Sequence, residues 1–342
     1  MRAVRLQGDG VAACCAAHLL ERAGIPVVWE RPSRAPVPVI MLGEQAIALL
    51  AEVFDRPDLF QSLPRVKTRE VLWGSGATPI HLPHSGVIVS ELELLASLRG
   101  TASSEVAAET ECRLFTSRPL PKQVVEHDFG RRFAVATPVS VDDGGAPACW
   151  VEACKAAWMF LIGGGTGQGW LLVVGDEEGT ALTESRLIAP RIRKLGEPSG
   201  RFPCFPRIVA PLWGCAAEQP WLACGTAALA FDPICGDGTA TAVREAILAV
   251  AAIRAIYEGA DPASAMRHFE SRLIVGFQKH LIHCAQYYRT GGSHPWWQEQ
   301  LTDIQRGIDW CAEQASRMPP YRYRLNGFRL EAIQPAEAVG IR

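Results

Sequence analysis

A glycine-rich turn near the N-terminus has the spacing that lets backbone approach a phosphate group. Gly8, Gly10 and Ala13 fit the pattern G-x-G-x-x-A, directly after an apolar run at residues 3–7. Gly8 permits a tight turn, Gly10 leaves room for a pyrophosphate, and Ala13 lets the following helix pack closely. The N-terminus of that helix offers free N–H groups and a positive dipole to phosphates. The pattern predicts a dinucleotide site.

An acidic residue completes the pattern. Glu30 ends a second apolar run and lies 30 − 8 = 22 residues beyond Gly8, where a carboxylate binds the 2′-hydroxyl of an adenosine ribose. A free 2′-hydroxyl fits FAD or NAD and disfavours NADP. Asp9 is unusual in the turn, because a carboxylate near phosphates is repulsive unless it points away. The alternative is a glycine-rich turn that occurs by chance. The position of Glu30 at the expected distance from Gly8 argues against it.

A second glycine-rich segment precedes a long Ala-rich helix. Its residues of interest are Gly225, Asp232, Pro233, Gly236, Gly238 and Thr239. The glycines let backbone approach a planar ring, and the helix N-terminus at Thr239 can stabilise negative charge on a reduced flavin. The Asp232 carboxylate can accept hydrogen bonds from ribityl hydroxyls. The alternative is an Asp-Pro turn that only caps a helix. This alternative is disfavoured because the first motif is also present and the two motifs follow each other in the expected order along the chain.

The elements that hold these motifs follow from hydrophobic periodicity. The run at 3–7, a helix of small residues at 11–23 and the run at 26–30 make a β–α–β unit. In such a unit the helix crosses between parallel strands. Further helices are predicted at 44–54 and 91–98.

The middle of the chain reads mainly as strands. Residues 65–90, 132–142 and 148–174 alternate or run apolar, which is typical of antiparallel strands, whereas 101–122 are weakly patterned. The glycines at 163–169 predict a hairpin turn and not a phosphate loop, because neither Gly-Lys-Ser/Thr nor a helix follows them.

The last third reads as helices at 239–257, 263–289 and 295–316, with an extended tail from Pro319. The element order predicts an α/β fold: a nucleotide domain interrupted by a second, antiparallel-sheet domain and followed by helices. Together with the two glycine-rich motifs, this is interpreted as a Rossmann-like FAD-binding domain interrupted by an antiparallel β-sheet substrate domain, with a helical C-terminal region. The predicted boundaries are 1–64, 87–135 and 216–258 for the discontinuous FAD-binding domain, 65–86 and 136–215 for the substrate domain, and 259–342 for the helical region.

Composition narrows the choice of partners. The 342 residues carry a net charge of 34 − 36 = −2, so no basic field exists to bind nucleic acid. The eleven cysteines are scattered and have neither a CxxC pair nor zinc spacing, which favours reduced thiols in a cytoplasmic protein with no metal. We expect no signal peptide and no membrane segment, since no apolar run reaches about 18 residues.

Several short motifs resemble segments of one known family. Residues 225–228 (Gly-Thr-Ala-Ala), Asp232-Pro233 and residues 236–238 (Gly-Asp-Gly) resemble its "GDAA…DP…G.G" segment. Trp29-Glu30-Arg31 resembles the end of its second strand, Pro206-Arg207 its "PR" pair and residues 127–131 its "DATGR" segment. The family is that of the FAD-dependent monooxygenases and reductases, which includes p-hydroxybenzoate hydroxylase, geranylgeranyl reductase and the tryptophan halogenases. The resemblance implies FAD as cofactor and places Arg31 beside Glu30 in the adenosine site.

Within that family the sequence is most similar to the LodB/GoxB-type flavoproteins, which mature tryptophylquinone oxidases. The features concerned are Gly43-Glu44, the short segment 224–238, Tyr287-Tyr288 and Pro295-Trp296-Trp297. This likeness implies an aromatic substrate, possibly a tryptophan of a partner protein or peptide. Trp296 and Trp297 can shape a substrate wall or anchor the helices on the sheet, and the anchor is favoured.

Three positions depart from the family pattern. Thr226 replaces the family Asp, and Glu91 stands where many relatives have an Arg; both changes weaken contacts to the cofactor. Halogenases need a Lys beside the substrate. Lys67 lies in the corresponding part of the chain but in another local context, so a solvated surface lysine is favoured and halogenation is disfavoured.

Glu44 and His84 are the candidate acid–base residues. Glu44 is supported by the resemblance, and His84 lies on the extended segment predicted to line the second domain, although a loop or edge histidine is the more common situation. His280 and Cys284 share one face of a predicted helix. They have no third ligand in local register, so a helix surface is favoured over a metal site.

The leading hypothesis is an FAD-dependent monooxygenase that hydroxylates an aromatic ring. One alternative is a reductase or dehydrogenase of the geranylgeranyl reductase type that acts on a small apolar molecule. The other is a non-catalytic FAD-binding maturation scaffold. No second G-x-G-x-x-G is present for NAD(P)H, so the electron donor is either NAD(P)H at a transient site or a separate flavin reductase.

Overall fold

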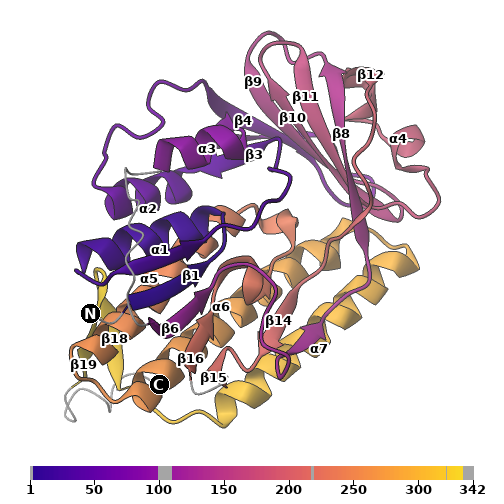
Figure 1. Cartoon of the computed structure of the whole chain (residues 1–342). Helices are drawn as coiled ribbons and strands as arrows, with labels where there is room; N and C mark the ends of the chain where they lie inside the picture. The colour runs from indigo at the N-terminus through magenta and orange to yellow at the C-terminus, as the bar shows by residue number, and fades with distance from the viewer. Residues whose placement is uncertain (1–2, 99–109, 217–218, 321, 334–342) are drawn as a thin grey trace.

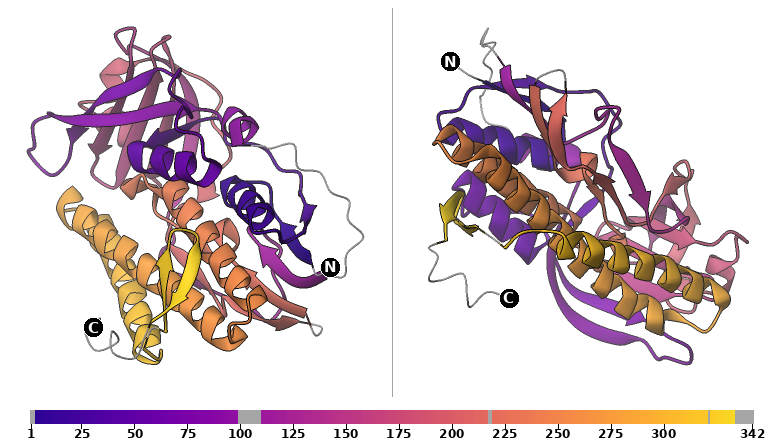
Figure 2. Two further views of the ribbon diagram at one scale, coloured as in Figure 1. Left: turned by 90° about the vertical axis from the view of Figure 1, so that its left-hand side faces the viewer. Right: turned by 90° about the horizontal axis from the view of Figure 1, so that it is seen from below.

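The computed structural model describes residues 3–98, 110–216, 219–320 and 322–333, and the fold is mixed α/β, as predicted. A small parallel sheet and its helices make one part, and a large twisted sheet stands over it (Figure 1). Two long helices of the C-terminal third run side by side beneath both parts (Figure 2).

The smaller sheet has five strands in the order β15-β16-β6-β1-β2. Their bounds are β1 Ala3–Gln7, β2 Val27–Glu30, β6 Thr110–Phe115, β15 Trp213–Ala216 and β16 Gln219–Ala223. Strands β2, β1, β6 and β16 run parallel to one another, and the edge strand β15 pairs with β16 in antiparallel orientation. The predicted β–α–β unit is therefore confirmed, and β1 lies between β2 and β6 with parallel pairing on both sides.

Strand β6 is a correction to the sequence analysis. It lies in the stretch 101–122, which appeared weakly patterned, yet it forms the strand between β1 and β16. Its side chains alternate between buried Cys112 and Leu114 and partly exposed Arg113. A six-residue strand that contains Glu and Arg gives little periodic signal, and only pairing with two neighbours identifies it.

The larger sheet has nine strands: eight in the order β12-β8-β11-β10-β9-β4-β5-β3, and a ninth, β13, that also pairs with β8. The bounds are β3 Ile40–Gly43, β4 Arg65–Leu72, β5 Ile80–Val89, β8 Phe133–Val141, β9 Pro147–Ala153, β10 Ala157–Gly164, β11 Gln168–Gly175, β12 Ile192–Leu195 and β13 Phe202–Pro203. The pairs are antiparallel except β4 with β9, which run parallel, so the prediction of a purely antiparallel sheet is wrong at this pair. The predicted β10–β11 hairpin is confirmed.

The two faces of β10 contact different surroundings. Met159 and Leu161 point into a small second core, whereas Trp158, Phe160 and Ile162 point the other way and line a cavity. Successive side chains of a strand point to opposite faces of a sheet. This nearly continuous apolar strand is therefore covered on both sides.

The helices agree closely with the predicted ones, except that the short α4 (Ala181–Glu184) was not predicted. Their bounds are α1 Val11–Arg22, α2 Glu44–Phe54, α3 Glu91–Leu98, α4 Ala181–Glu184, α5 Gly238–Tyr257, α6 Pro262–Gly291 and α7 Pro295–Ser316. Three 3-10 turns lie at η1 Ala189–Arg191, η2 Gly225–Ala227 and η3 Pro233–Cys235. Helices α1 and α5 pack against each other, and their many buried Ala and Cys side chains allow a close approach.

Helices α6 and α7 begin at clear capping signals. The Asp261 carboxylate accepts the Ser264 N–H at 2.9 Å, and Pro262 opens α6. His294 and Pro295 start α7 in the same way. Trp297 is fully buried and donates to the backbone oxygens of Cys154 and Lys155. The anchor interpretation of Trp297 fits this position, because its ring ties α7 to the larger sheet.

Two small sheets complete the fold. One joins β7 Val125–Asp128, β14 Arg207–Ala210 and β17 Leu229–Ala230. The other is a hairpin of β18 Tyr323–Asn326 and β19 Arg329–Ala332, so the predicted extended tail folds back on itself. Among the helices that the structure describes, none has an apolar stretch long enough to cross a membrane.

Candidate active site

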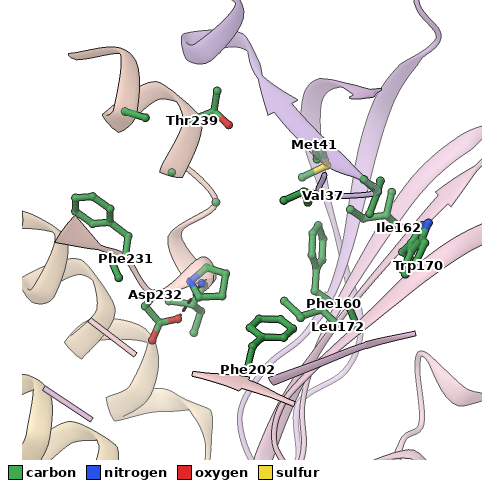
Figure 3. A pocket seen from close by; sticks show the side chains of 18 of the residues that line it. Val37, Met41, Phe160, Ile162, Trp170, Leu172, Phe202, Phe231, Asp232 and Thr239 are labelled. Carbon is green, nitrogen blue, oxygen red and sulfur yellow. Dashed lines mark hydrogen bonds between the residues drawn. The ribbon is translucent and has the colours of Figure 1, made fainter. Parts of the chain in front are cut away.

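A cavity of about 570 Å³ lies between the larger sheet and the loop that leads into α5. One wall comes from the sheet, where Phe160, Ile162, Trp170 and Leu172 point into the space (Figure 3). Val37 and Met41 contribute from the segment before α2 (Figure 3). The wall is aromatic and aliphatic, which is typical of a pocket that binds a flat apolar ring.

The opposite wall is the second glycine-rich segment found in the sequence. Gly225, Asp232, Pro233, Gly236, Gly238 and Thr239 all belong to the cavity lining, as does Phe231 (Figure 3). Gly225 has φ +60°, and a Cβ there would lie 2.9 Å from the Ala12 side chain of α1. This close approach brings the turn against the N-terminal helix, so the two predicted motifs meet in space.

The first motif forms a tight turn between β1 and α1. Gly8 has φ +144°, and a Cβ at this position would lie 1.9 Å from Oγ1 of Thr116. Gly10 is the N-cap of α1, with no side-chain cap and no acidic residue in the first turn. The first N–H groups of α1 therefore point out of the helix without a side-chain cap, as an anion site requires. Ala13 is fully buried.

A cation lies at this helix N-terminus. Nη2 of Arg34 would be 3.6 Å from a Cβ on Gly10, and its Nε donates to Asp9 at 3.0 Å. The same guanidinium binds the Glu91 carboxylate, with Nη1 2.8 Å from Oε2. Arg34 thus neutralises both acidic residues that appeared out of place in the sequence. The spacing of the glycine motif did not predict that Arg34 would lie at this helix N-terminus.

Glu30 and Arg31 lie at the end of β2, as predicted. Glu30 is partly exposed and forms an ion pair with Arg5 at 3.0 Å. The Arg31 guanidinium stacks 3.8 Å from the ring centroid of Trp29, whose Nε1 donates to the Gly8 carbonyl at 2.8 Å. The indole therefore links the end of β2 to the glycine turn.

Asp232 has a different role from the predicted one. Its side chain has no exposed surface and forms a buried ion pair with Arg132. It also accepts the Tyr288 hydroxyl at 2.9 Å and the Ile234 N–H at 3.0 Å. Since protein donors surround the carboxylate, the ribityl hydrogen bond predicted from the sequence finds no accessible oxygen. Asp232 instead fixes the turn that lines the cavity.

The two predicted acid–base residues do not line the cavity. His84 lies close enough to Glu44 for the carboxylate to act on its charge, but burial and the neighbouring Arg69 dominate and lower the pKa of His84. Arg69 is the residue that faces the cavity, with its Nη2 3.5 Å from Nε2 of His84. His84 thus contacts Arg69 from outside the cavity lining, and Glu44 also lies outside that lining. Sequence reasoning did not identify Arg69.

Glu245 is an ionisable carboxyl in the cavity wall that the sequence analysis missed. It lies in α5 and accepts the Gly225 N–H at 2.6 Å through Oε2. Its Oε1 is buried and has no hydrogen-bond partner. Burial raises the pKa of Glu245 to about 8. Its position about two turns into an Ala-rich helix was the available signal, because a Glu there is otherwise unexplained.

The helix-surface interpretation of His280 and Cys284 is wrong. Both side chains are buried on α6, and a third group, Cys235, approaches them from η3. Lys67 is exposed on β4, as the surface interpretation implies, and none of the described residues that line the cavity is a lysine.

No protein-family model matches this chain, and no curated protein matches it in sequence. Solved structures do match in fold. The flavin-dependent halogenase CmlS aligns with a TM-score of 0.73 at 15% identity, over 97% of this chain and 84% of that one. A peptidyl tryptophan dihydroxylase, QhpG, essential for tryptophylquinone cofactor biogenesis, aligns with a TM-score of 0.65 at 18% identity, over 97% and 86%.

An aromatic monooxygenase is similar as well. The p-nitrophenol 4-monooxygenase PnpA from Pseudomonas putida DLL-E4 aligns with a TM-score of 0.61 at 14% identity, over 92% of this chain and 98% of that one. The chain therefore has the fold of the flavin-dependent halogenases and aromatic monooxygenases. The resemblance stated from the sequence motifs is confirmed at the level of the fold.

Proposed function

We propose that this chain is an FAD-dependent monooxygenase that hydroxylates an aromatic ring. The observation that carries the proposal is a cavity wall of apolar and aromatic side chains that faces the Gly225–Glu245 segment. Phe160 lies opposite Phe231 across this cavity (Figure 3). The fold shared with flavin-dependent enzymes supports it. We further propose the division into a discontinuous FAD-binding domain, a substrate domain and a helical region at the boundaries given above.

The residues at both motifs fit FAD. Gly8 and Gly10 leave the α1 N-terminus open to a pyrophosphate, and Arg34 adds a positive charge there. Glu30, with Arg31 beside it, stands where an adenosine ribose would lie. Gly236 and Gly238 have no atoms within 4 Å of a Cβ position, so open space adjoins their backbone. These residues would hold the adenosine and pyrophosphate at one end and admit the flat ring at the other.

When bound and reduced, the flavin supplies the activation of O₂. The chain's own residues then have to exclude water and orient the substrate ring. Phe160, Ile162 and Leu172 supply an apolar surface for that ring. Arg69 lines the cavity, and its guanidinium offers a positive charge there. A substrate with a polar or anionic substituent would be oriented by it.

Glu245 is the residue we assign to holding a proton at the cavity wall. With a pKa of about 8, its carboxyl is protonated at neutral pH. Oε2 is engaged by Gly225, which leaves Oε1 as the atom from which a proton can move. His84 then acts through Arg69, by positioning its guanidinium. Glu44 stays a proposed acid–base residue that does not line the cavity.

Hydroxylation is favoured over halogenation by the cavity lining. Halogenase chemistry of the tryptophan type needs a lysine beside the substrate, and the only lysine proposed for that role, Lys67, is exposed on β4. We therefore expect Lys67→Ala to leave any product yield unchanged. A chlorinated or brominated product that depends on Lys67 would contradict the proposal.

We propose a tryptophan side chain of a partner protein or peptide as the substrate, on the basis of the motif resemblance and the similarity to QhpG. The reductase and the non-catalytic scaffold are kept as alternatives. NAD(P)H, or a separate flavin reductase, is the proposed electron donor.

The test has two stages. The absorbance spectrum of the purified chain is recorded before and after addition of FAD, and the released cofactor is identified by mass. Aromatic compounds and Trp-containing peptides are then incubated with the loaded protein, O₂ and an external reductant. A substrate mass gain of one oxygen supports the monooxygenase. A change of two hydrogens indicates the reductase, and bound FAD that no donor reduces indicates the scaffold.

A further inference from the structure

Two cysteines and a histidine meet beside the cavity although they are far apart in sequence. Sγ of Cys235 lies 3.6 Å from Sγ of Cys284, and Cys284 lies 3.2 Å from Nε2 of His280. The three ligand atoms are within 4.8 Å of one another. Cys235 belongs to η3, whereas the other two residues belong to α6. The cluster therefore joins two different elements.

Cys235 is placed to react, and Cys284 is placed to follow it. Cys235 is partly exposed, and both its neighbours, Ile234 and Gly236, line the cavity. A hydrogen bond from the Cys284 thiol, helped by His280, lowers the pKa of Cys235, which increases the share of its reactive thiolate. Cys284 is fully buried, and burial raises its pKa well above the ordinary value.

Other described cysteines lack this arrangement. Burial alone raises the pKa of Cys311, and burial with nearby carboxylates raises those of Cys112 and Cys154, each to about 12, which makes these thiols unreactive. The Cys235–Cys284 sulfur separation is about 1.6 Å longer than a disulfide bond. A disulfide between them requires the two sulfur atoms to approach by that amount.

The surroundings favour a redox pair over a metal site. Nε2 of His280 already accepts the backbone N–H of Asp232 at 2.9 Å. The guanidinium of Arg132 acts on Cys284 as a nearby positive charge. Only three ligand atoms converge among the described residues, whereas a structural zinc site has four.

We propose that Cys235 and Cys284 are a peroxide-sensing thiol pair that closes to a disulfide at the cavity wall. The Cys235 thiolate attacks one oxygen of hydrogen peroxide. The O–O bond breaks, Cys235 becomes a sulfenic acid, and the hydroxide that leaves takes up a proton to become water. The Cys284 thiol then attacks the Cys235 sulfur. The S–S bond forms, the S–O bond breaks, and a second water leaves with the Cys284 proton.

The balance is two thiols and one hydrogen peroxide giving one disulfide and two waters. An external dithiol reverses the reaction. The disulfide ties η3 to α6, and thereby fixes the turn between Pro233 and Gly236 that lines the cavity. If the proposed function holds, FAD affinity then differs between the reduced and the oxidised chain, because the flavin ring would lie against that turn. The thiol chemistry itself needs no flavin.

The test uses the full chain, first without and then with FAD. The protein is treated with one equivalent of hydrogen peroxide, and free thiols are counted under denaturing conditions. Disulfide-linked peptides are identified by mass. We expect two of the eleven thiols to disappear, one peptide pair linking Cys235 to Cys284, and full recovery with dithiothreitol. Cys284→Ser should stop at a Cys235 sulfenic acid, which dimedone traps. Cys235→Ser should remove the fast reaction.

Exposed Cys215 is the internal control. We expect Cys235 to oxidise at least tenfold faster than Cys215, and Cys215→Ser to leave the linked peptide unchanged. Equal oxidation rates, or the absence of the linked peptide, would overturn the proposal. So would one equivalent of bound metal in the purified chain that is lost in Cys284→Ser. Failure to bind FAD would count against the proposed function only, since the thiol readouts do not depend on it.

Discussion

The Arg34 guanidinium binds the Glu91 carboxylate in a bidentate ion pair, with Nη1 2.8 Å from Oε2 and Nη2 2.5 Å from Oε1. The family resemblance implies an arginine at the position of Glu91, and in this chain the Glu91 carboxylate is neutralised by Arg34. The positive charge comes from the loop after β2 instead, and it is held over the N-terminus of α1. Ion pairing with Glu91 raises the pKa of Arg34.

Arg34→Ala is expected to weaken FAD binding by about ten- to one-hundredfold. Charge-assisted hydrogen bonds contribute about 1.5–3 kcal/mol, and the variant also leaves Asp9 and Glu91 unneutralised near the phosphates. Titration with FAD, followed by flavin fluorescence, measures the dissociation constant. Arg34→Ala combined with Glu91→Ala should regain part of the affinity. The control is Arg193→Ala, which removes an exposed pair with Asp142 and should change nothing. Unchanged affinity in Arg34→Ala would remove Arg34 from the site.

Gly8 and Gly10 are expected to respond differently to alanine. Gly8→Ala puts a Cβ 1.9 Å from Thr116 in a left-handed backbone conformation, so it should lower the free energy of unfolding by about 2 kcal/mol or more. Gly10 has φ −89° and room for a Cβ. Gly10→Ala should therefore fold normally and lose FAD affinity. Urea denaturation and FAD titration of both variants separate the two effects, and equal stability losses would contradict this reasoning.

The raised pKa of Glu245 leads us to expect that the stability of the chain depends on pH. Its folded-state pKa of about 8 lies above the ordinary value of 4.5. The free energy of unfolding is highest below pH 4.5, where Glu245 is protonated in both the folded and the unfolded chain. It falls as the pH rises towards 8, because the unfolded chain loses the proton first. The total fall is on the order of 4 kcal/mol.

Glu245→Gln keeps an oxygen for the Gly225 N–H and cannot ionise, so its stability between pH 5 and 8 should be flatter than that of the unchanged chain. Thermal unfolding of the FAD-free protein across this range measures the difference. Glu30→Gln, at a partly exposed position, is the control and should keep the original slope. A parallel slope in Glu245→Gln would show that Glu245 is already ionised when folded.

A buried series of hydrogen bonds joins Trp158, Tyr288 and Asp232. We expect the contributions of these side chains to stability to depend on one another. Nε1 of Trp158 donates to the Tyr288 hydroxyl at 3.1 Å, which donates to Asp232 at 2.9 Å. Tyr288→Phe leaves buried groups unpaired and should cost about 1–3 kcal/mol. Tyr287→Phe is the matched control, since the Tyr287 side chain is half exposed, and should change stability by under about 0.5 kcal/mol.

A double-mutant cycle with Trp158→Phe tests whether the Trp158–Tyr288 contact carries this cost. Once Tyr288 has been replaced, Trp158→Phe should cost less than it does alone, because the indole N–H has already lost its partner. Additive losses would mean that the contact contributes nothing. Urea denaturation of the four proteins gives the coupling energy.

Local patterns in the sequence were sufficient for much of the fold. The motif from Gly8 to Ala13 predicted a strand, a tight turn and a helix, and β1 and α1 are there. Apolar alternation predicted the β10–β11 hairpin. Helical periodicity predicted helices at 263–289 and 295–316, and α6 and α7 are there. These features depend on residues that are neighbours along the chain, so their physics can be read from one segment at a time.

Contacts between distant segments needed the tertiary structure. The strand β6 is recognisable only between β1 and β16, because pairing rather than periodicity defines it. Asp232 was assigned to ribityl hydroxyls because nothing in its own segment reveals Arg132, 100 residues away, or Tyr288, 56 residues away. Both partners bury the carboxylate and change its role.

The sequence by itself determined that two glycine-rich segments stand at the ends of a nucleotide-binding pattern, because backbone freedom and helix starts are local properties. Only the tertiary structure decided which charges meet there. It brought Arg34 to Glu91, Glu245 to Gly225 and Cys235 to Cys284. Electrostatic and thiol chemistry depend on distances of a few ångströms between elements, and the packing of helices and sheets sets those distances.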